Sequence, residues 1–272
     1  MSDDNYTTTL LYCTLLVKMK KSAGQAKIAL ITGSSRNIGK SIAFSLAKDG
    51  YDIILNCRKI TAEANQTKKQ IQKTDRKVWL ITGDVGKESE MKIMFKRIAK
   101  LITKIDVLVN NAGFDYGYSI ENYSIKQVQQ VLQTNLLGTI IVTKYALPLL
   151  KKSQNPVIIN ISSRCGGPTT IDGIGAYGPA KAGVIKFTQC CAREFAPYKI
   201  RVNCVAPGFT DTQLNRAILP DQTFWQQQAQ RNPRQRVGQP QDTAHVVAFL
   251  ASNKADYVNG QTIYVTGGSE FV

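Results

Sequence analysis

Tyr177 and Lys181 stand four residues apart in the segment YGPAK. On a helix this spacing places both side chains on one face. A phenol is a poor acid near neutral pH, and lowering its pKa from about 10 to about 7 requires about 4 kcal/mol of preferential phenolate stabilisation. An ammonium about 4 Å away supplies roughly that much at an effective dielectric constant of about 20, although desolvation opposes it. The pair could therefore perform general acid–base catalysis; the alternative is an ordinary pair on a helix surface.

A second candidate site is the turn in LITGSSRNIGKSIAFSLAKDG, residues 30–50, where an apolar strand pattern passes into a helical pattern. The turn holds Gly33, Ser35, Arg36, Asn37, Ile38 and Gly39. A helix N-terminus presents unpaired N–H groups and partial positive charge, and glycines let a phosphate approach the backbone. The pattern predicts a pyrophosphate-binding turn; a plain connection between strand and helix is the alternative.

The elements that must position these residues follow an alternating pattern. Continuous apolar, β-branched runs predict buried strands, and the helical spacing between them predicts covering helices. This alternation predicts one α/β domain over residues 25–272: a Rossmann-like, doubly wound, mostly or wholly parallel sheet of about seven strands. The expected strands are 27–32, 52–57, 77–82, 107–110, 157–162, 200–205 and 261–265, and the expected helices are 40–49, 61–73, 87–104, 124–150, 176–196 and 240–251.

One interval does not follow this alternation of strand and helix patterns. Residues 211–240 are rich in glutamine and hold Phe224 and Trp225 side by side. An insertion after a strand's carboxyl end overhangs the ligand crevice of an open α/β sheet, so we interpret it as a substrate lid. A helical pair packed on the surface or on another subunit is the alternative.

Several segments together resemble the short-chain dehydrogenase/reductase family. TGSSRNIG resembles the family's cofactor fingerprint T-G-x-x-x-G-x-G, and the other matching segments follow in the family's order. Within the family the chain is most similar to 3-oxoacyl-[acyl-carrier-protein] reductases. The matching segments are DV (84–85), NNAG (110–113), Asn135, ISS (161–163), YGPAK (177–181), RVNCVAPGFTDT (201–212) and NGQTIYVTGG (259–268).

The resemblance implies catalytic roles for four residues. Tyr177 would be the acid/base, Lys181 would lower its pKa and hold the nicotinamide ribose, Ser163 would bind the substrate oxygen, and Asn135 would anchor a proton-relay water. Two departures stand out. Asn37 replaces the second glycine, a position where asparagine tolerates a left-handed backbone. Thirteen residues separate Ser163 from Tyr177, which leaves Ser162 as a second candidate for the substrate contact.

The residues after the second strand indicate the cofactor. That strand ends without an Asp or Glu to hold a ribose 2′-hydroxyl, and Arg58 follows it. An arginine can pair with a 2′-phosphate, and Arg36 resembles a second basic residue of NADP-preferring members. NADP(H) is therefore expected. The resemblance implies these binding residues: Gly33, Ser35, Arg36, Asn37, Ile38, Gly39, Arg58, Asp84, Val85, Asn111, Ala112, Gly113, Tyr177, Lys181, Pro207, Gly208, Thr210 and Thr212.

The composition indicates the cellular compartment and which other ligands to expect. Six cysteines without a CxxC pair and a single histidine, His245, predict buried thiols, a reducing cytoplasmic location and no metal site. The net charge is +16, but the cations are spread without a nucleic-acid motif, so nucleic acid is not expected. No window reaches the roughly 18 apolar residues of a membrane span. Residues 1–24 are interpreted as a tail outside the fold, with Met19 as an alternative start.

These observations predict an NADPH-dependent enzyme that reduces a ketone to a secondary alcohol. The substrate could be a 3-oxoacyl group on acyl carrier protein, an acidic carrier that suits a basic surface. A small free carbonyl such as a sugar, steroid or pteridine is the alternative, and so is a sensor that binds NADPH without turnover. The resemblance further implies a homotetramer.

Overall fold

The computed structural model describes residues 26–219 and 221–269, so the predicted tail at residues 1–24 lies outside the described residues. Its centre is one seven-stranded sheet in the order β3-β2-β1-β4-β5-β6-β7, and every neighbouring pair is parallel. The prediction of a single α/β domain with a wholly parallel sheet is confirmed. The strands are β1 (Ile28–Ile31), β2 (Asp52–Cys57), β3 (Val78–Thr82), β4 (Val107–Asn110), β5 (Val157–Ile161), β6 (Arg201–Pro207) and β7 (Thr262–Val265).

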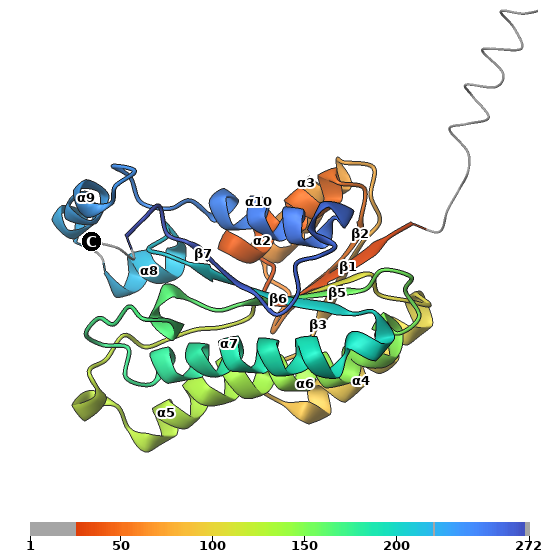
Figure 1. Ribbon diagram of the computed structural model, residues 1–272, viewed down its shortest axis with the longest axis horizontal. Coiled ribbons are helices and arrows are strands. Elements are labelled where there is room, and N and C mark those ends of the chain that lie inside the picture. The colour runs from red at the N-terminus through yellow and green to blue at the C-terminus, as the bar shows by residue number, and fades with distance from the viewer. Residues whose placement is uncertain (1–25, 220, 270–272) are drawn as a thin grey trace, which may run out of the picture.

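Helices cover both faces of this sheet (Figure 1). One face carries α2 (Asn37–Lys48), α3 (Ala62–Gln72) and α10 (Pro240–Ala251). The other face carries α4 (Glu88–Leu101), α6 (Gly138–Leu150) and α7 (Tyr177–Glu194). This arrangement explains why β1, β2, β4 and β5 are buried along their whole length, since helices cover both faces of the central sheet.

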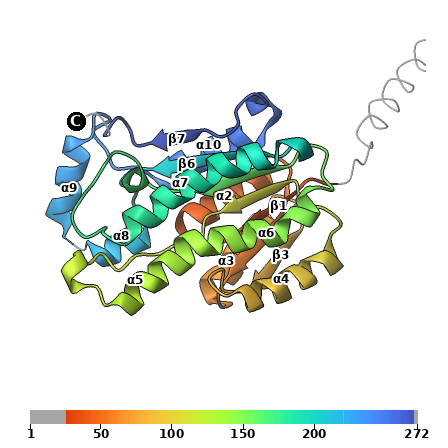
Figure 2. The ribbon, with the colours of Figure 1, turned by 60° about the horizontal axis from the view of Figure 1, so that its bottom comes forward.

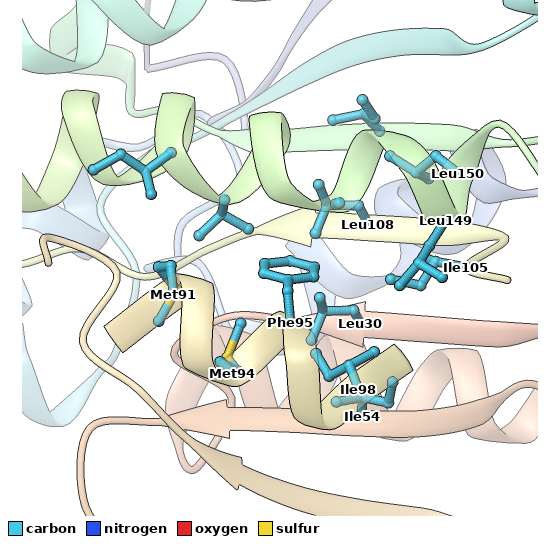
Figure 3. Packing of buried hydrophobic residues seen from close by; sticks show 14 of the residues in the cluster. Leu30, Ile54, Met91, Met94, Phe95, Ile98, Ile105, Leu108, Leu149 and Leu150 are labelled. Carbon is cyan, nitrogen blue, oxygen red and sulfur yellow. The ribbon is translucent and has the colours of Figure 1, made fainter. Parts of the chain in front are cut away.

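Alternate residues of each strand supply two separate cores. Leu30 of β1 packs in the cluster around Phe95 of α4, which Figure 3 shows between the sheet and the helices on this face. Its neighbour Ile31 packs in the opposite cluster with Ile42 and Leu46 of α2. Side chains alternate across a strand with a period of two residues, so a continuous apolar run fills both cores.

The strand order reverses between β1 and β4. The chain builds β2 and β3 on one side of β1, then returns to build β4 to β7 on the other side. Open α/β sheets bind ligands beyond the carboxyl ends of the strands at such a reversal, where the connecting loops diverge. Gly33 follows β1 and Asn111 follows β4 at this edge.

Two segments differ from the expected helices. The helix expected at 124–150 consists of α5 (Ile125–Leu132), a π-helical turn (Gln133–Leu137) and α6. The interval 211–240 contains α8 (Gln213–Ile218) and α9 (Gln222–Arg231), which lie together at one end of the molecule in both views (Figures 1 and 2). A π turn often marks a functional position, and Asn135 lies within this one.

Candidate active site

The turn between β1 and α2 requires its glycines. Gly33 has a φ of 61°, and a Cβ on it would lie 2.8 Å from the Ala112 Cα. A Cβ on Gly39 would collide with the Gly33 carbonyl oxygen. Asn37 also takes the left-handed conformation, with a φ of 50°. The turn thus keeps its shape with asparagine at the position where the family's fingerprint has its second glycine.

Hydrogen bonds from the neighbouring strand hold the turn in place. The Thr32 hydroxyl oxygen accepts from the backbone N–H groups of Asn111 and Ala112, both at 3.0 Å. The Asn111 amide donates to the carbonyl oxygens of Thr32 and Gly33, also at 3.0 Å. The side chain of Asn111, expected to contact the cofactor, is therefore used to fix the turn.

The N-terminus of α2 is suited to a phosphate. Its N-cap residue Arg36 forms no side-chain capping bond, and its first turn contains no acidic residue. The first N–H groups of a helix have no partner inside the helix, so an anion can accept from them. The glycine turn and the N-terminus of α2 therefore fit the pyrophosphate of a dinucleotide.

The structure brings Ser163, Tyr177 and Lys181 together at the start of α7. The Ser163 side chain hydrogen-bonds the Tyr177 side chain, and the Lys181 Nζ lies 5.5 Å from the Tyr177 ring centroid. The Lys181 Nζ donates to the Ile161 carbonyl oxygen at 2.9 Å. Ser162 is buried, and its hydroxyl donates to the Lys181 carbonyl oxygen at 2.8 Å. Ser163 rather than Ser162 therefore faces the phenol.

Burial governs the electrostatics of the pair. It raises the pKa of the Tyr177 phenol, and the hydrogen bond from Ser163 opposes this only in part. Burial also lowers the pKa of Lys181 from 10.5 to about 8. Desolvation of the phenolate outweighs its stabilisation by the neighbouring side chains, so the lowering of the phenol pKa expected from Lys181 and the nicotinamide together stays a prediction. A phenol that keeps its proton is able to donate it.

Asn135 presents an unsatisfied acceptor beside this pair. Its amide nitrogen donates to the carbonyl oxygens of Phe114 and Val131, at 2.7 and 2.9 Å. Its Oδ1 is buried without a hydrogen-bond partner among the described residues. A Cβ on Gly113 would collide with this oxygen and lie 3.3 Å from the Lys181 Nζ. A buried acceptor without a donor is costly, so the site fits a ligand or water hydroxyl.

The other expected cofactor residues gather at the carboxyl ends of the strands. Arg58 follows β2 and is exposed, while Asp84 follows β3 and accepts from the Gly86 N–H at 3.0 Å. Gly208 follows β6, where a Cβ would lie 2.9 Å from the Thr266 Cα. Of the other expected residues, Ser35 and Ile38 lie after β1, Val85 lies after β3, and Pro207 and Thr210 lie at the end of β6 and after it.

The segment after β6 crosses toward the loop that follows β4. Thr212, another expected cofactor residue, caps α8 by accepting from the Asn215 N–H at 3.2 Å. Ile218 of α8 packs so closely on Gly117 that a Cβ on this glycine would lie 2.5 Å from its Cγ2. Trp225 of α9 is buried and donates to the Leu219 carbonyl oxygen at 2.7 Å. The contact between Ile218 and Gly117 places α8 beside the loop that follows β4, and the role of residues 211–240 as a substrate lid stays a prediction.

Sequence reasoning missed two residues of this region. Thr32 is the first residue of the quoted fingerprint. A threonine at the end of an apolar strand places a hydroxyl in a buried environment, so a hydrogen-bonding role for it could have been inferred. Gln213 contacts the glycine turn from the start of α8, and no local pattern in the sequence indicates it.

Residues 26–219 and 221–269 contain no group of three or more His, Cys, Asp or Glu side chains placed to hold a metal ion. None of the helices in this part of the chain is long and apolar enough to cross a membrane.

Fold and site together define a nicotinamide-dependent type of Rossmann oxidoreductase, and the chain belongs to the short-chain dehydrogenase/reductase family. The family model described as enoyl-(acyl carrier protein) reductase matches residues 33–270. The recognition made from the sequence motifs is confirmed.

Individual relatives agree with this assignment over almost the whole domain. The chain is 37% identical to 3-oxoacyl-[acyl-carrier-protein] reductase of Staphylococcus epidermidis over 242 residues, which are 89% of this chain and 98% of that protein. It is 35% identical to the Aquifex aeolicus reductase of the same name, covering 90% of this chain and 97% of the other. It resembles the structure of a Burkholderia cenocepacia gluconate 5-dehydrogenase in complex with NADP and tartrate, with a TM-score of 0.84, 30% identity and coverage of 90% and 96%.

Proposed function

We propose that this protein is an NADPH-dependent reductase that converts a ketone to a secondary alcohol, with Tyr177 as the proton donor. The observation that carries the proposal is the half-buried side chain of Tyr177, which is hydrogen-bonded to Ser163 and flanked by Lys181. Burial keeps the phenol protonated, which is the state that carbonyl reduction requires.

The chain's own residues would manage the proton. When bound, the reduced nicotinamide supplies the hydride. The hydroxyl groups of Ser163 and Tyr177 would both donate to the substrate oxygen, and the Tyr177 proton would pass to the alkoxide as negative charge develops. The Lys181 ammonium, fixed by the Ile161 carbonyl oxygen, would stabilise the resulting phenolate. The Oδ1 of Asn135 would hold a water that restores the proton from solvent.

The proposed preference for NADPH depends on the end of β2. Asn56, the last residue but one of β2, is buried, and its amide nitrogen donates to the Gly83 carbonyl oxygen at 3.1 Å, so this amide is already used. Cys57 and Arg58 follow, and no carboxylate stands at this strand end to repel a 2′-phosphate. Arg58 and Arg36 would pair with that phosphate from two sides.

The proposed substrate is a 3-oxoacyl thioester on acyl carrier protein. The names of the Staphylococcus and Aquifex relatives support this choice, and the net charge of +16 would attract an acidic carrier. Similarity to gluconate 5-dehydrogenase supports a small free carbonyl as the second candidate. NADPH oxidation measured with acetoacetyl thioesters and with a panel of free ketones distinguishes them, and salt sensitivity confined to the carrier-bound substrate supports the first.

The Tyr177→Phe variant tests the central role. Removal of the proton donor should lower kcat by about 10² to 10⁴, while the Kd for NADP⁺ stays within about twofold. Tyr145→Phe is the matched control, because Tyr145 lies on α6 and hydrogen-bonds the exposed Glu88 at 2.9 Å. Retained turnover in Tyr177→Phe would refute the mechanism, and wild-type NADPH binding with no turnover on any carbonyl would favour a sensor.

A further inference from the structure

Gln213 connects two opposite charges beside the glycine turn. Its Oε1 accepts from the Arg36 Nη1 at 3.3 Å, and its Nε2 donates to the Glu63 Oε1 at 3.1 Å. Arg36 belongs to the turn before α2, Glu63 to the first turn of α3, and Gln213 to the start of α8. Neither Arg36 nor Glu63 takes part in an ion pair within residues 26–219 and 221–269.

The backbone of α8 fixes this bridge. The Gln213 N–H donates to the Asn37 Oδ1 at 3.2 Å, and Thr212 caps the same helix start. Asn37 holds its left-handed conformation next to Arg36. The glutamine side chain is therefore directed between the guanidinium and the carboxylate by contacts on both sides.

We propose that Gln213 is a specificity-determining residue, a neutral spacer that keeps Glu63 from pairing with Arg36 and so leaves the guanidinium for the 2′-phosphate of NADP(H). An amide matches both neighbours, because its oxygen accepts from the cation and its nitrogen donates to the anion. The charge of Arg36 remains uncompensated, and a phosphate carrying more than one negative charge pairs with it better than a hydroxyl does. This inference rests on the proposed NADPH preference.

Removal of the spacer should act through Glu63. In Gln213→Ala the carboxylate can pair with Arg36 and compete with the phosphate. An exposed ion pair is weak, so the Kd for NADP⁺ should rise about threefold to fivefold. The Kd for NAD⁺, which carries no 2′-phosphate, should change less than about twofold. In Gln213→Ala/Glu63→Gln the competing charge is gone, and NADP⁺ affinity should return to that of Glu63→Gln alone.

The experiment measures the Kd of both nucleotides by calorimetry for the wild type, these variants and Asn215→Ala. Asn215→Ala is the control for lid anchorage, because it removes the bond from the Asn215 amide to the Thr210 carbonyl oxygen without altering a charge. The spacer role of Gln213 would be overturned if Gln213→Ala weakened the binding of NADP⁺ and NAD⁺ equally. It would also be overturned if adding Glu63→Gln to Gln213→Ala did not restore NADP⁺ affinity. A wild type that binds both nucleotides equally would refute the NADPH preference itself and the spacer with it, so the wild-type ratio separates the two failures.

Discussion

Replacing Lys181 by methionine tests how burial sets the chemistry of the site. The folded protein lowers the pKa of this lysine from 10.5 to about 8. That shift corresponds to about 3 kcal/mol, by which the folded state disfavours the ammonium relative to the unfolded state. Methionine has a similar length and no charge, so Lys181→Met removes this cost together with the ammonium.

The sign of the pH dependence follows from the two pKa values. Between pH 8 and 10.5 the unfolded chain binds more protons at Lys181 than the folded chain, so the free energy of unfolding rises with pH through this window. From pH 7 to pH 10 the wild type should gain about 2 to 3 kcal/mol of unfolding free energy relative to Lys181→Met. Measurements should stop near pH 10. Burial raises the pKa of Tyr177, so the stability that this phenol contributes to the folded state falls as the pH rises above the ordinary tyrosine pKa of 10.0.

Urea unfolding at pH 7, 8, 9 and 10, with protein concentration held constant, measures the difference. Lys186→Met is the matched control, because Lys186 lies on the same helix and is exposed. The plot of unfolding free energy against pH for Lys186→Met should run parallel to that of the wild type. If the curve of Lys181→Met also runs parallel to the wild type, the lysine is not desolvated as the structure implies. The variant should in addition lose turnover, because no ammonium remains to stabilise the phenolate.

Three further predictions concern neighbouring positions. Ser162→Ala should lower the free energy of unfolding by about 1 kcal/mol through loss of its buried hydrogen bond, with kcat retained, whereas Ser163→Ala should lower kcat and leave stability nearly unchanged. Thermal unfolding should show that Asn37→Ala costs about 1 kcal/mol while Asn37→Gly is tolerated, since alanine resists a φ of 50°. Arg58→Asp should raise the KM for NADPH about tenfold or more and spare that for NADH; equal shifts would contradict the assignment of Arg58.

The sequence determined the elements and their class because the relevant patterns are local. Apolar runs predicted all seven strands within two residues of their observed ends, and the spacing of Tyr177 and Lys181 placed both on one helix. The first turn could be recognised from its glycines between a strand pattern and a helical pattern, and the structure then shows that Gly33 and Gly39 leave no room for a Cβ. A period of two or 3.6 residues depends only on neighbours in the chain, so it can be read without tertiary structure.

The tertiary structure alone decided which side chains meet and what burial does to them. The choice of Ser163 over Ser162 depends on a contact with α7, and the π turn that presents Asn135 interrupts a helix whose sequence pattern is continuous. Gln213 reaches Arg36 across 177 residues of chain. The spacing of Tyr177 and Lys181 predicts a Coulomb attraction, but the desolvation that raises the pKa of Tyr177 could not be inferred from it. Desolvation depends on everything packed around a group, and that packing is a property of the folded chain.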